Sequence, residues 1–203
     1  MARKGLIAAL VLGMAAILVL GACSTGKKVS RRDVEEQIDL SGRWNDTDSR
    51  LVAEEMIRDS LEWPWIDNFR SENGERPTVI AYGVKNRTSE HINTQTFMKD
   101  LERAFVKSGR VRVVAARDQR EDIREERAEQ QAGFTQDPAR IGKELGADFV
   151  LTGTINSIED REGDEQVVFY QTNLELISVE TSEKVWIGDK KIKKFIERDA
   201  YTY

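Results

Sequence analysis

The first 22 residues decide which part of the chain can form the folded domain, because we do not expect them to belong to it. Arg3 and Lys4 precede a nearly unbroken apolar run over residues 6–20, which ends in small residues. A charged start, an apolar stretch of about fifteen residues and a small-residue exit are typical of a secretion signal and are short for a transmembrane helix. We therefore expect residues 1–22 to be removed and the fold to be built from the rest.

Cys23, the only cysteine among the 203 residues, stands at the end of this signal. The stretch Leu20-Gly21-Ala22-Cys23 resembles the lipobox of bacterial lipoproteins. That resemblance implies a diacylglycerol on the Cys23 thiol, cleavage before Cys23 and an acyl chain on the new amino group. Two or more acyl chains give stable anchoring, at about 0.8 kcal/mol per buried methylene. The alternative is a cleaved signal followed by a free cysteine.

Ser24 bears on the membrane to which such an anchor would be delivered. By family rule, an aspartate after the acylated cysteine implies retention in the inner membrane, and this chain has serine there. The expected location is therefore the periplasmic face of the outer membrane.

The composition of the remaining chain indicates one soluble domain. About 180 residues follow Cys23, enough for a single domain with a proper core. Charged residues make up 33 % of the chain, and the formal net charge of -5 argues against a general nucleic-acid binder. With one cysteine no disulfide can form within the domain, so its stability must come from the core.

Residues 23–47 have the composition of a lipid-anchored flexible tether. Basic residues come first, acidic residues follow, and few apolar side chains are present. Such a segment cannot offset its ordering entropy by burial. Fully extended it would reach at most roughly 80 Å. The folded domain is then expected over residues 48–203.

Apolar periodicity predicts two long helices in this domain. One begins at Asp48 and is stopped by Pro64, and the other runs over residues 93–108 with an asparagine N-cap and a glycine stop. Trp63 and Trp65 flank the proline. Such a pair more often packs a loop onto the core than forms a docking surface, and we favour packing.

The other apolar segments predict a sheet. A short helix is expected to end at Gly146, with Ile141 and Leu145 facing inward. Two helix-to-strand units followed by an antiparallel hairpin predict an α/β (α+β) fold, a single compact domain with a central mixed sheet flanked by helices. The expected strands cover residues 78–84, 110–116, 149–155, 166–179 and 184–196.

Two charged stretches admit a structural and a functional interpretation. Ten of the fifteen residues over 117–131 are charged, which favours a solvated helix stitched by pairs such as Glu121 with Arg124 over a partner-facing surface. In the last strand, lysines favour protection of an exposed sheet edge over an anionic ligand site. These are Lys190, Lys191, Lys193 and Lys194.

No motif for catalysis or cofactor binding stands out in the sequence. It has no Gly-rich phosphate loop and no G-x-S-x-G elbow, and its only histidine, His91, has no neighbouring metal ligands and is expected in a loop. A carboxylate pair for glycoside cleavage stays possible among the 36 acidic residues, but none sits in an apolar motif. We therefore expect a binding protein, not an enzyme, without metal or cofactor apart from the covalent lipid.

Five segments carry a resemblance to a known family: residues 42–49, 86–94, 141–149, 184–188 and 191–195. Together they resemble the LpoB-type lipoproteins. The Leu-Gly-Ala-Asp junction over residues 145–148 is less specific, since it is similar in curli-secretion lipoproteins and in the amino-terminal domain of the Tol-Pal protein TolB.

The resemblance implies a compact α/β domain, similar to the TolB amino-terminal domain, that binds and activates a bifunctional penicillin-binding protein. That enzyme polymerises and crosslinks peptidoglycan, and the lipoprotein, expected to be a monomer, would not be catalytic. The best-known members carry a long proline-rich tether, whereas residues 23–47 are short and contain no proline. A structural or secretion component of the cell envelope is the alternative.

Polar surface that the core does not need is free to contact a partner. The loop after the first strand and the charged helix are therefore the predicted contact regions. The candidate residues are Asn86, Arg87 and His91 in the loop and Arg120, Arg124 and Arg127 in the helix.

Overall fold

The computed structural model describes residues 29–33, 36–133 and 144–197. The chain divides into two units, Met1–Glu36 and Gln37–Tyr203, and the fold described below is that of the second. Within the described residues, no helix has the length and apolar character needed to span a membrane.

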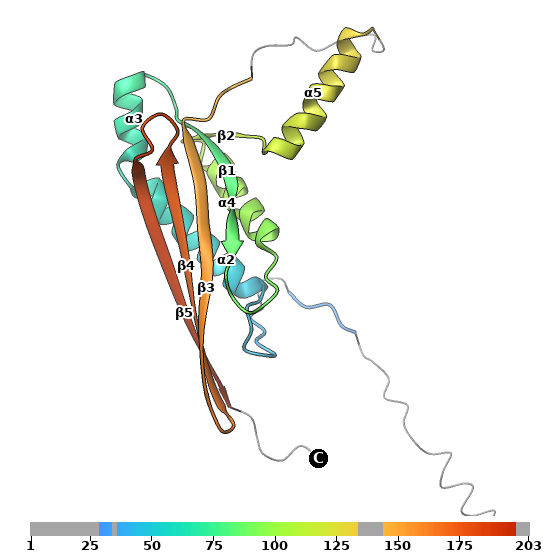
Figure 1. The fold of residues 1–203 in the computed structure, drawn as a ribbon, viewed down its shortest axis with the longest axis vertical. Coiled ribbons are helices and arrows are strands. Elements are labelled where there is room, and N and C mark those ends of the chain that lie inside the picture. The colour runs from blue at the N-terminus through green and yellow to red at the C-terminus, as the bar shows by residue number, and fades with distance from the viewer. Residues whose placement is uncertain (1–28, 34–35, 134–143, 198–203) are drawn as a thin grey trace, which may run out of the picture. The chain divides into compact units, whose positions relative to one another are not determined.

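A mixed sheet of five strands forms the centre of the fold (Figure 1). Its order is β2-β1-β3-β4-β5, with β1 parallel to β2 and β3, and with β4 antiparallel to β3 and β5. This confirms the predicted α+β fold with a central mixed sheet. The strands are β1 Thr78–Asn86, β2 Arg112–Val114, β3 Phe149–Glu162, β4 Glu165–Ser178 and β5 Lys184–Glu197.

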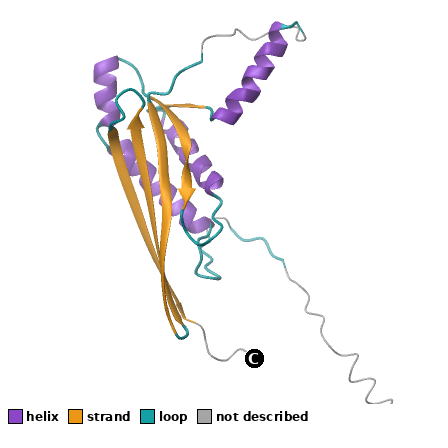
Figure 2. Ribbon diagram, viewed as in Figure 1, coloured by secondary structure: helices purple, strands orange, loops and turns teal. Residues whose placement is uncertain are grey.

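Helices α2 and α4 lie on one side of this sheet (Figure 2). Their apolar faces and the facing side chains of the sheet form one core, to which Trp186, Phe97 and Leu151 belong. No helix of the described ranges covers the opposite side of the sheet. The helices are α2 Asp46–Glu62, α3 Trp65–Asn73, α4 Thr94–Ser108 and α5 Arg117–Gln131.

The period of two along the strands decides which side chains enter the core. In β4 every second residue is buried, including Leu174 and Leu176, while the residues between them are partly exposed. Helix α4 supplies the matching stripe with Phe97, Leu101 and Phe105. The sheet is therefore buried on one face and open on the other.

The predicted long helices are present. Helix α2 begins two residues before Asp48, and Asn45 caps it. Helix α4 begins after its cap Asn93 and ends at Gly109, whose φ of 64° is left-handed. The strand predicted over residues 110–116 shortens to the three residues of β2.

Helix α3 was not predicted, because Pro64 suggested only a stop. Pro64 instead stands at the N-cap of α3, where a missing N–H and a φ of -64° favour helix initiation. Trp65 is buried as expected, but Trp63 is 52 % exposed, so packing of the pair onto the core is correct for Trp65 only.

Strand β3 continues well beyond the predicted residues 149–155. Its second half is polar, yet it pairs with β4 as far as Glu162 opposite Glu165. Gly163, with a φ of 58°, closes the tight turn between them. Backbone pairing with a long neighbour thus extends a strand without an apolar pattern.

Two expected boundaries differ from the structure. The tether was expected to reach residue 47, but the folded unit begins at Gln37. We call residues 37–43 the strap. Leu145, expected to face inward, is 53 % exposed and lies outside any helix, whereas most of the short helix expected before Gly146 lies outside the described residues.

The close pairing of β3 and β4 at Gly153 gives a test of the register. A Cβ at Gly153 would collide with the backbone carbonyl oxygen of Asn173 and lie 2.6 Å from the Leu174 side chain. Gly153→Ala should lower the free energy of unfolding by roughly 1–3 kcal/mol in urea titrations. Gly146→Ala is the control, because nothing lies within 4 Å of its added Cβ. Equal stability of the two variants would contradict this register.

Candidate partner-binding surface

The loop after β1 contains three of the predicted contact residues, and one of them is structural. The Asn86 side-chain amide donates to the Glu90 carbonyl oxygen at 2.6 Å, and its oxygen accepts the Thr88 N–H at 2.9 Å. Asn86 therefore shapes the loop. The side chains of Arg87 and His91 are exposed and available to a partner.

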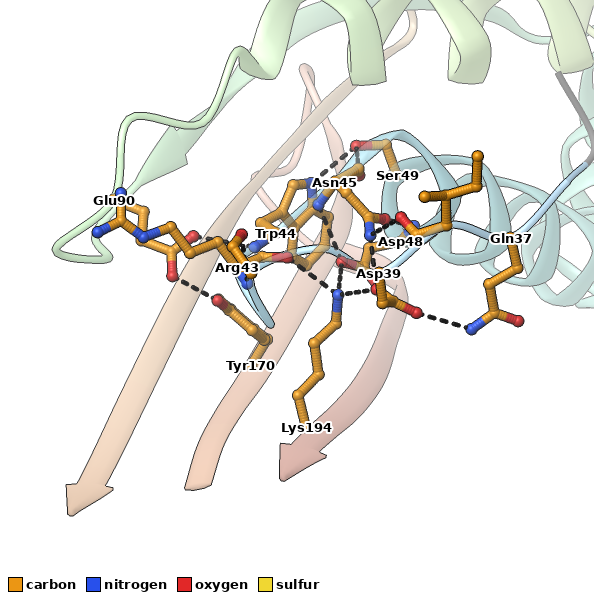
Figure 3. Close-up of polar contacts among 12 residues, drawn as sticks. Gln37, Asp39, Arg43, Trp44, Asn45, Asp48, Ser49, Glu90, Tyr170 and Lys194 are labelled. Carbon is orange, nitrogen blue, oxygen red and sulfur yellow. Dashed lines mark hydrogen bonds and ion pairs between the residues drawn. The ribbon is translucent and has the colours of Figure 1, made fainter. Parts of the chain in front are cut away.

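Glu90, which the sequence did not single out, joins this loop to distant parts of the chain (Figure 3). Its carboxylate accepts the backbone N–H of Trp44 at 2.9 Å and the hydroxyl of Tyr170 at 2.5 Å. Burial raises the pKa of Tyr170, and the hydrogen bond to Glu90 raises it further, so the phenol stays a donor. Trp44 packs edge-on against Tyr170, with ring centroids 5.5 Å apart.

Lys194 holds the strap against the sheet (Figure 3). Its Nζ lies 2.8 Å from Asp39 and 2.6 Å from Asp48, and it donates to the Arg43 carbonyl oxygen at 3.0 Å. Burial lowers the pKa of Lys194, but the hydrogen bonds to the two carboxylates outweigh it, so the pKa lies above its ordinary value. Lys194 is therefore charged in a largely buried position.

The lysines of β5 thus have two roles, of which only one was predicted. β5 is an edge strand, as expected. Lys191 and Lys193 are exposed on the open face and fit the protective interpretation. Lys190 and Lys194 instead point to the helix side, where Lys190 pairs with Glu55 of α2.

Two arginines of α5, Arg124 and Arg127, converge on one carboxylate. Arg124 forms a bidentate pair with Glu144, at 2.9 and 2.8 Å, and Arg127 lies 3.3 Å from the same group. Hydrogen bonding to Arg124 lowers the pKa of Glu144 and raises that of Arg124. Arg120, also on α5, is half-buried.

Helix α5 has no buried residue, in agreement with a solvated helix. The close ion pairs differ from the predicted pairing of Glu121 with Arg124: Glu121 pairs with Arg117 at 3.1 Å and Arg124 with Glu144, although the charge of Glu121 still raises the pKa of Arg124. A turn of helix separates Arg117 from Glu121, which is the spacing at which such pairs meet.

The two predicted contact regions do not form one site. The loop begins at Asn86, the last residue of β1. Helix α5 follows β2, which pairs with the first three residues of β1. The loop therefore follows the carboxyl end of β1, whereas the start of α5 lines a hollow with the middle of β1 and the start of α4.

The open face of the sheet carries a third surface, which sequence patterns did not identify. Ile158 lies opposite Phe169, and Phe195 opposite Val167, all on the side away from the helices. Ile158 is 67 % and Phe195 60 % exposed. We call these four residues the apolar patch. Exposed apolar residues that gather in this way are typical of interaction sites.

Among the described residues, no group of three or more His, Cys, Asp or Glu is placed to hold a metal ion. The family model described as "Peptidoglycan-synthase activator LpoB" matches residues 48–192. The chain belongs to this family.

Three solved structures are similar to the chain at low identity. The LpoB C-terminal domain from Escherichia coli is 19 % identical, covers 72 % of this chain and 99 % of its own, and has a TM-score of 0.41. The LpoB C-terminal domain from Salmonella enterica is 18 % identical, covers 72 % of this chain and 99 % of its own, and has a TM-score of 0.40. Lipoprotein GNA1162 from Neisseria meningitidis is 16 % identical, covers 59 % of this chain and 83 % of its own, and has a TM-score of 0.38. The comparison with curated proteins gave no match.

Asp39 gives a direct measure of strap docking. The hydrogen bond from Lys194 is the main cause that lowers the pKa of Asp39 from 3.8 to about 2. A lowered folded-state pKa means that this contact contributes fully above pH 3.8 and is lost as the pH falls toward about 2. Lys194→Gln should return the pKa toward 3.8, measured by NMR titration of the carboxyl carbon.

Lys191→Gln is the matched control for this titration. Lys191 lies on the open face of the same strand, where it pairs with Asp189 at 3.0 Å, so its replacement should leave Asp39 unchanged. An ordinary Asp39 pKa in the unmodified protein would contradict docking of the strap.

Proposed function

We propose that this protein is a lipoprotein of the outer membrane that binds a bifunctional penicillin-binding protein and activates peptidoglycan synthesis by it. The match of the activator family to residues 48–192 carries this proposal. The lipobox that ends at Cys23 supports the anchor, although Cys23 lies outside the described residues. The protein acts on the synthase by docking and takes no part in the chemistry.

The apolar patch and α5 are the surfaces best suited to this docking. Interfaces have an apolar core and a polar rim, and Phe195 and Ile158 supply exposed apolar area. Charged groups mainly steer the approach of a partner, and the arginines of α5 suit that role. Docking through both would combine steering with burial.

The length of the linker limits where the partner is met. Thirteen residues separate Cys23 from Gln37, where the folded unit begins. Fully extended they span at most roughly 50 Å. An inner-membrane synthase must therefore project its docking region close to the outer membrane. This short reach is also the observation that favours the alternative, a structural or secretion component of the envelope.

The anchor is tested at Cys23. Cys23→Ser removes the thiol that would carry the diacylglycerol, and with it the stable membrane partition that two or more acyl chains provide. We expect loss of palmitate labelling and release from the membrane fraction, or accumulation of the uncleaved chain. Ser24→Ala is the control and should stay labelled. Unchanged labelling of Cys23→Ser would refute acylation there.

The activator role is tested by mixing the purified protein with the synthase of the same cell and lipid-linked precursor. We expect direct binding and faster glycan polymerisation or crosslinking, with no activity of the lipoprotein alone on peptidoglycan. Absence of both binding and stimulation would exclude the activator role and favour the structural or secretion alternative.

Two sets of variants assign the docking surface in the same assay. Charge reversal of Arg120, Arg124 and Arg127 should slow association and leave the melting temperature nearly unchanged, because α5 has no buried residue. Phe195→Ala with Ile158→Ala should instead speed dissociation. Lys191→Gln is the matched exposed control. Stimulation that survives both sets would place docking elsewhere.

A further inference from the structure

We propose that the strap, residues 37–43, is a releasable segment that docks on β5 beside the start of α2 and lengthens the tether when it detaches. It lies outside residues 48–192, which match the family, as does its anchor Lys194.

Weak surface contacts hold the strap in place. Asp39 accepts from Lys194 at 2.8 Å and from the Asn45 side chain at 2.6 Å, and its side chain is 35 % exposed. Leu40 is 92 % exposed, so its apolar side chain contributes no burial. Ile38 is 38 % exposed and Gly42 approaches Ile196, so the strap combines limited apolar contact with these polar contacts. The pair with Lys194 is open to solvent on the Asp39 side, so solvent screens it and its contribution to stability is modest.

The domain retains paired charges when the strap leaves. Lys194 keeps Asp48 at 2.6 Å, and Asp48 is a buried residue of α2. Glu90 likewise keeps the Tyr170 hydroxyl. An unpaired buried charge, which would make detachment costly, therefore does not arise. Release of the strap can occur without unfolding of the core.

The hinge lies between Gly42 and Trp44. Gly42 has a φ of 68°, a left-handed conformation that glycine adopts without strain. Trp44 stays fixed by the hydrogen bond from its indole N–H to Ser49 at 2.7 Å and by its packing on Tyr170. The segment that detaches therefore ends before Trp44.

Release changes how far the domain can move from its anchor. Seven residues add at most roughly 25 Å of extended chain to the linker. This consequence for reach rests on the proposed anchoring at Cys23. Release of the strap does not rest on that anchoring, because release depends only on contacts within the folded unit.

Chymotrypsin cleavage of the purified full chain under native conditions tests the release. The bond after Leu40 lies wholly within the strap, and a peptide of residues 37–43 is the reference for an undocked segment. Cleavage after Leu40 should be at least tenfold slower in the protein than in the peptide, yet nearly independent of urea at low concentration, as expected for local opening. Asp39→Asn, made in both protein and peptide, should speed cleavage of the protein relative to the peptide by roughly three- to tenfold without changing the melting temperature. Lys191→Gln on the open face is the matched control and should leave the rate unchanged.

Three results would overturn the proposal. Cleavage after Leu40 with the steep urea dependence of global unfolding would show that the strap is a permanent part of the fold. Equal cleavage of the unmodified protein and of the peptide of residues 37–43 would show that the strap does not dock. An unchanged rate in Asp39→Asn would show that the pair with Lys194 is not the latch. None of these measurements involves the synthase or the lipid, so they are independent of the proposed function.

Discussion

Burial of one face of the sheet beneath α2 and α4 is the constraint on which the rest of the structure depends. Leu151, Leu174 and Trp186 face those helices, and the period of two then directs the alternate residues of the same strands to the other side. The open face is thus a consequence of the core. A domain of this size obtains both a stable core and a broad surface for a partner from the same strands.

The sequence predicted the parts of the fold that local pattern controls. The apolar stripe of α4, its cap Asn93 and its stop Gly109 are all read from neighbouring residues, and the structure has each of them. Prediction from the sequence failed where a residue has two structural roles or where a neighbouring strand decides the structure. Pro64 ends one helix and begins the next, and the polar half of β3 is a strand only because β4 runs beside it.

The polar network around Glu90 could not be predicted for a similar reason. Glu90, Tyr170 and Trp44 are far apart in sequence, and a glutamate in a polar loop carries no local sign of its partners. Lys194 resembled a protective edge lysine because edge lysines and buried ion-paired lysines look alike in a strand. What separates the two kinds of lysine is the face of the strand on which they lie. The apolar Ile192 and Ile196, two residues before and after Lys194 on the same face, could have indicated that Lys194 points to the helix side.

The strap and the apolar patch meet on the same short stretch of β5. Lys194, which holds the strap, and Phe195, which belongs to the patch, are neighbours that point to opposite faces. Residues of the strap, among them Asp39 and Leu40, nevertheless line one hollow with Phe195, so a partner that covers Phe195 comes close to the strap. Docking of a partner and release of the strap therefore take place side by side on β5. Because the strap and the apolar patch both depend on β5, a partner that stiffens or shifts this edge strand would also change the position of Lys194 and its contacts with the strap.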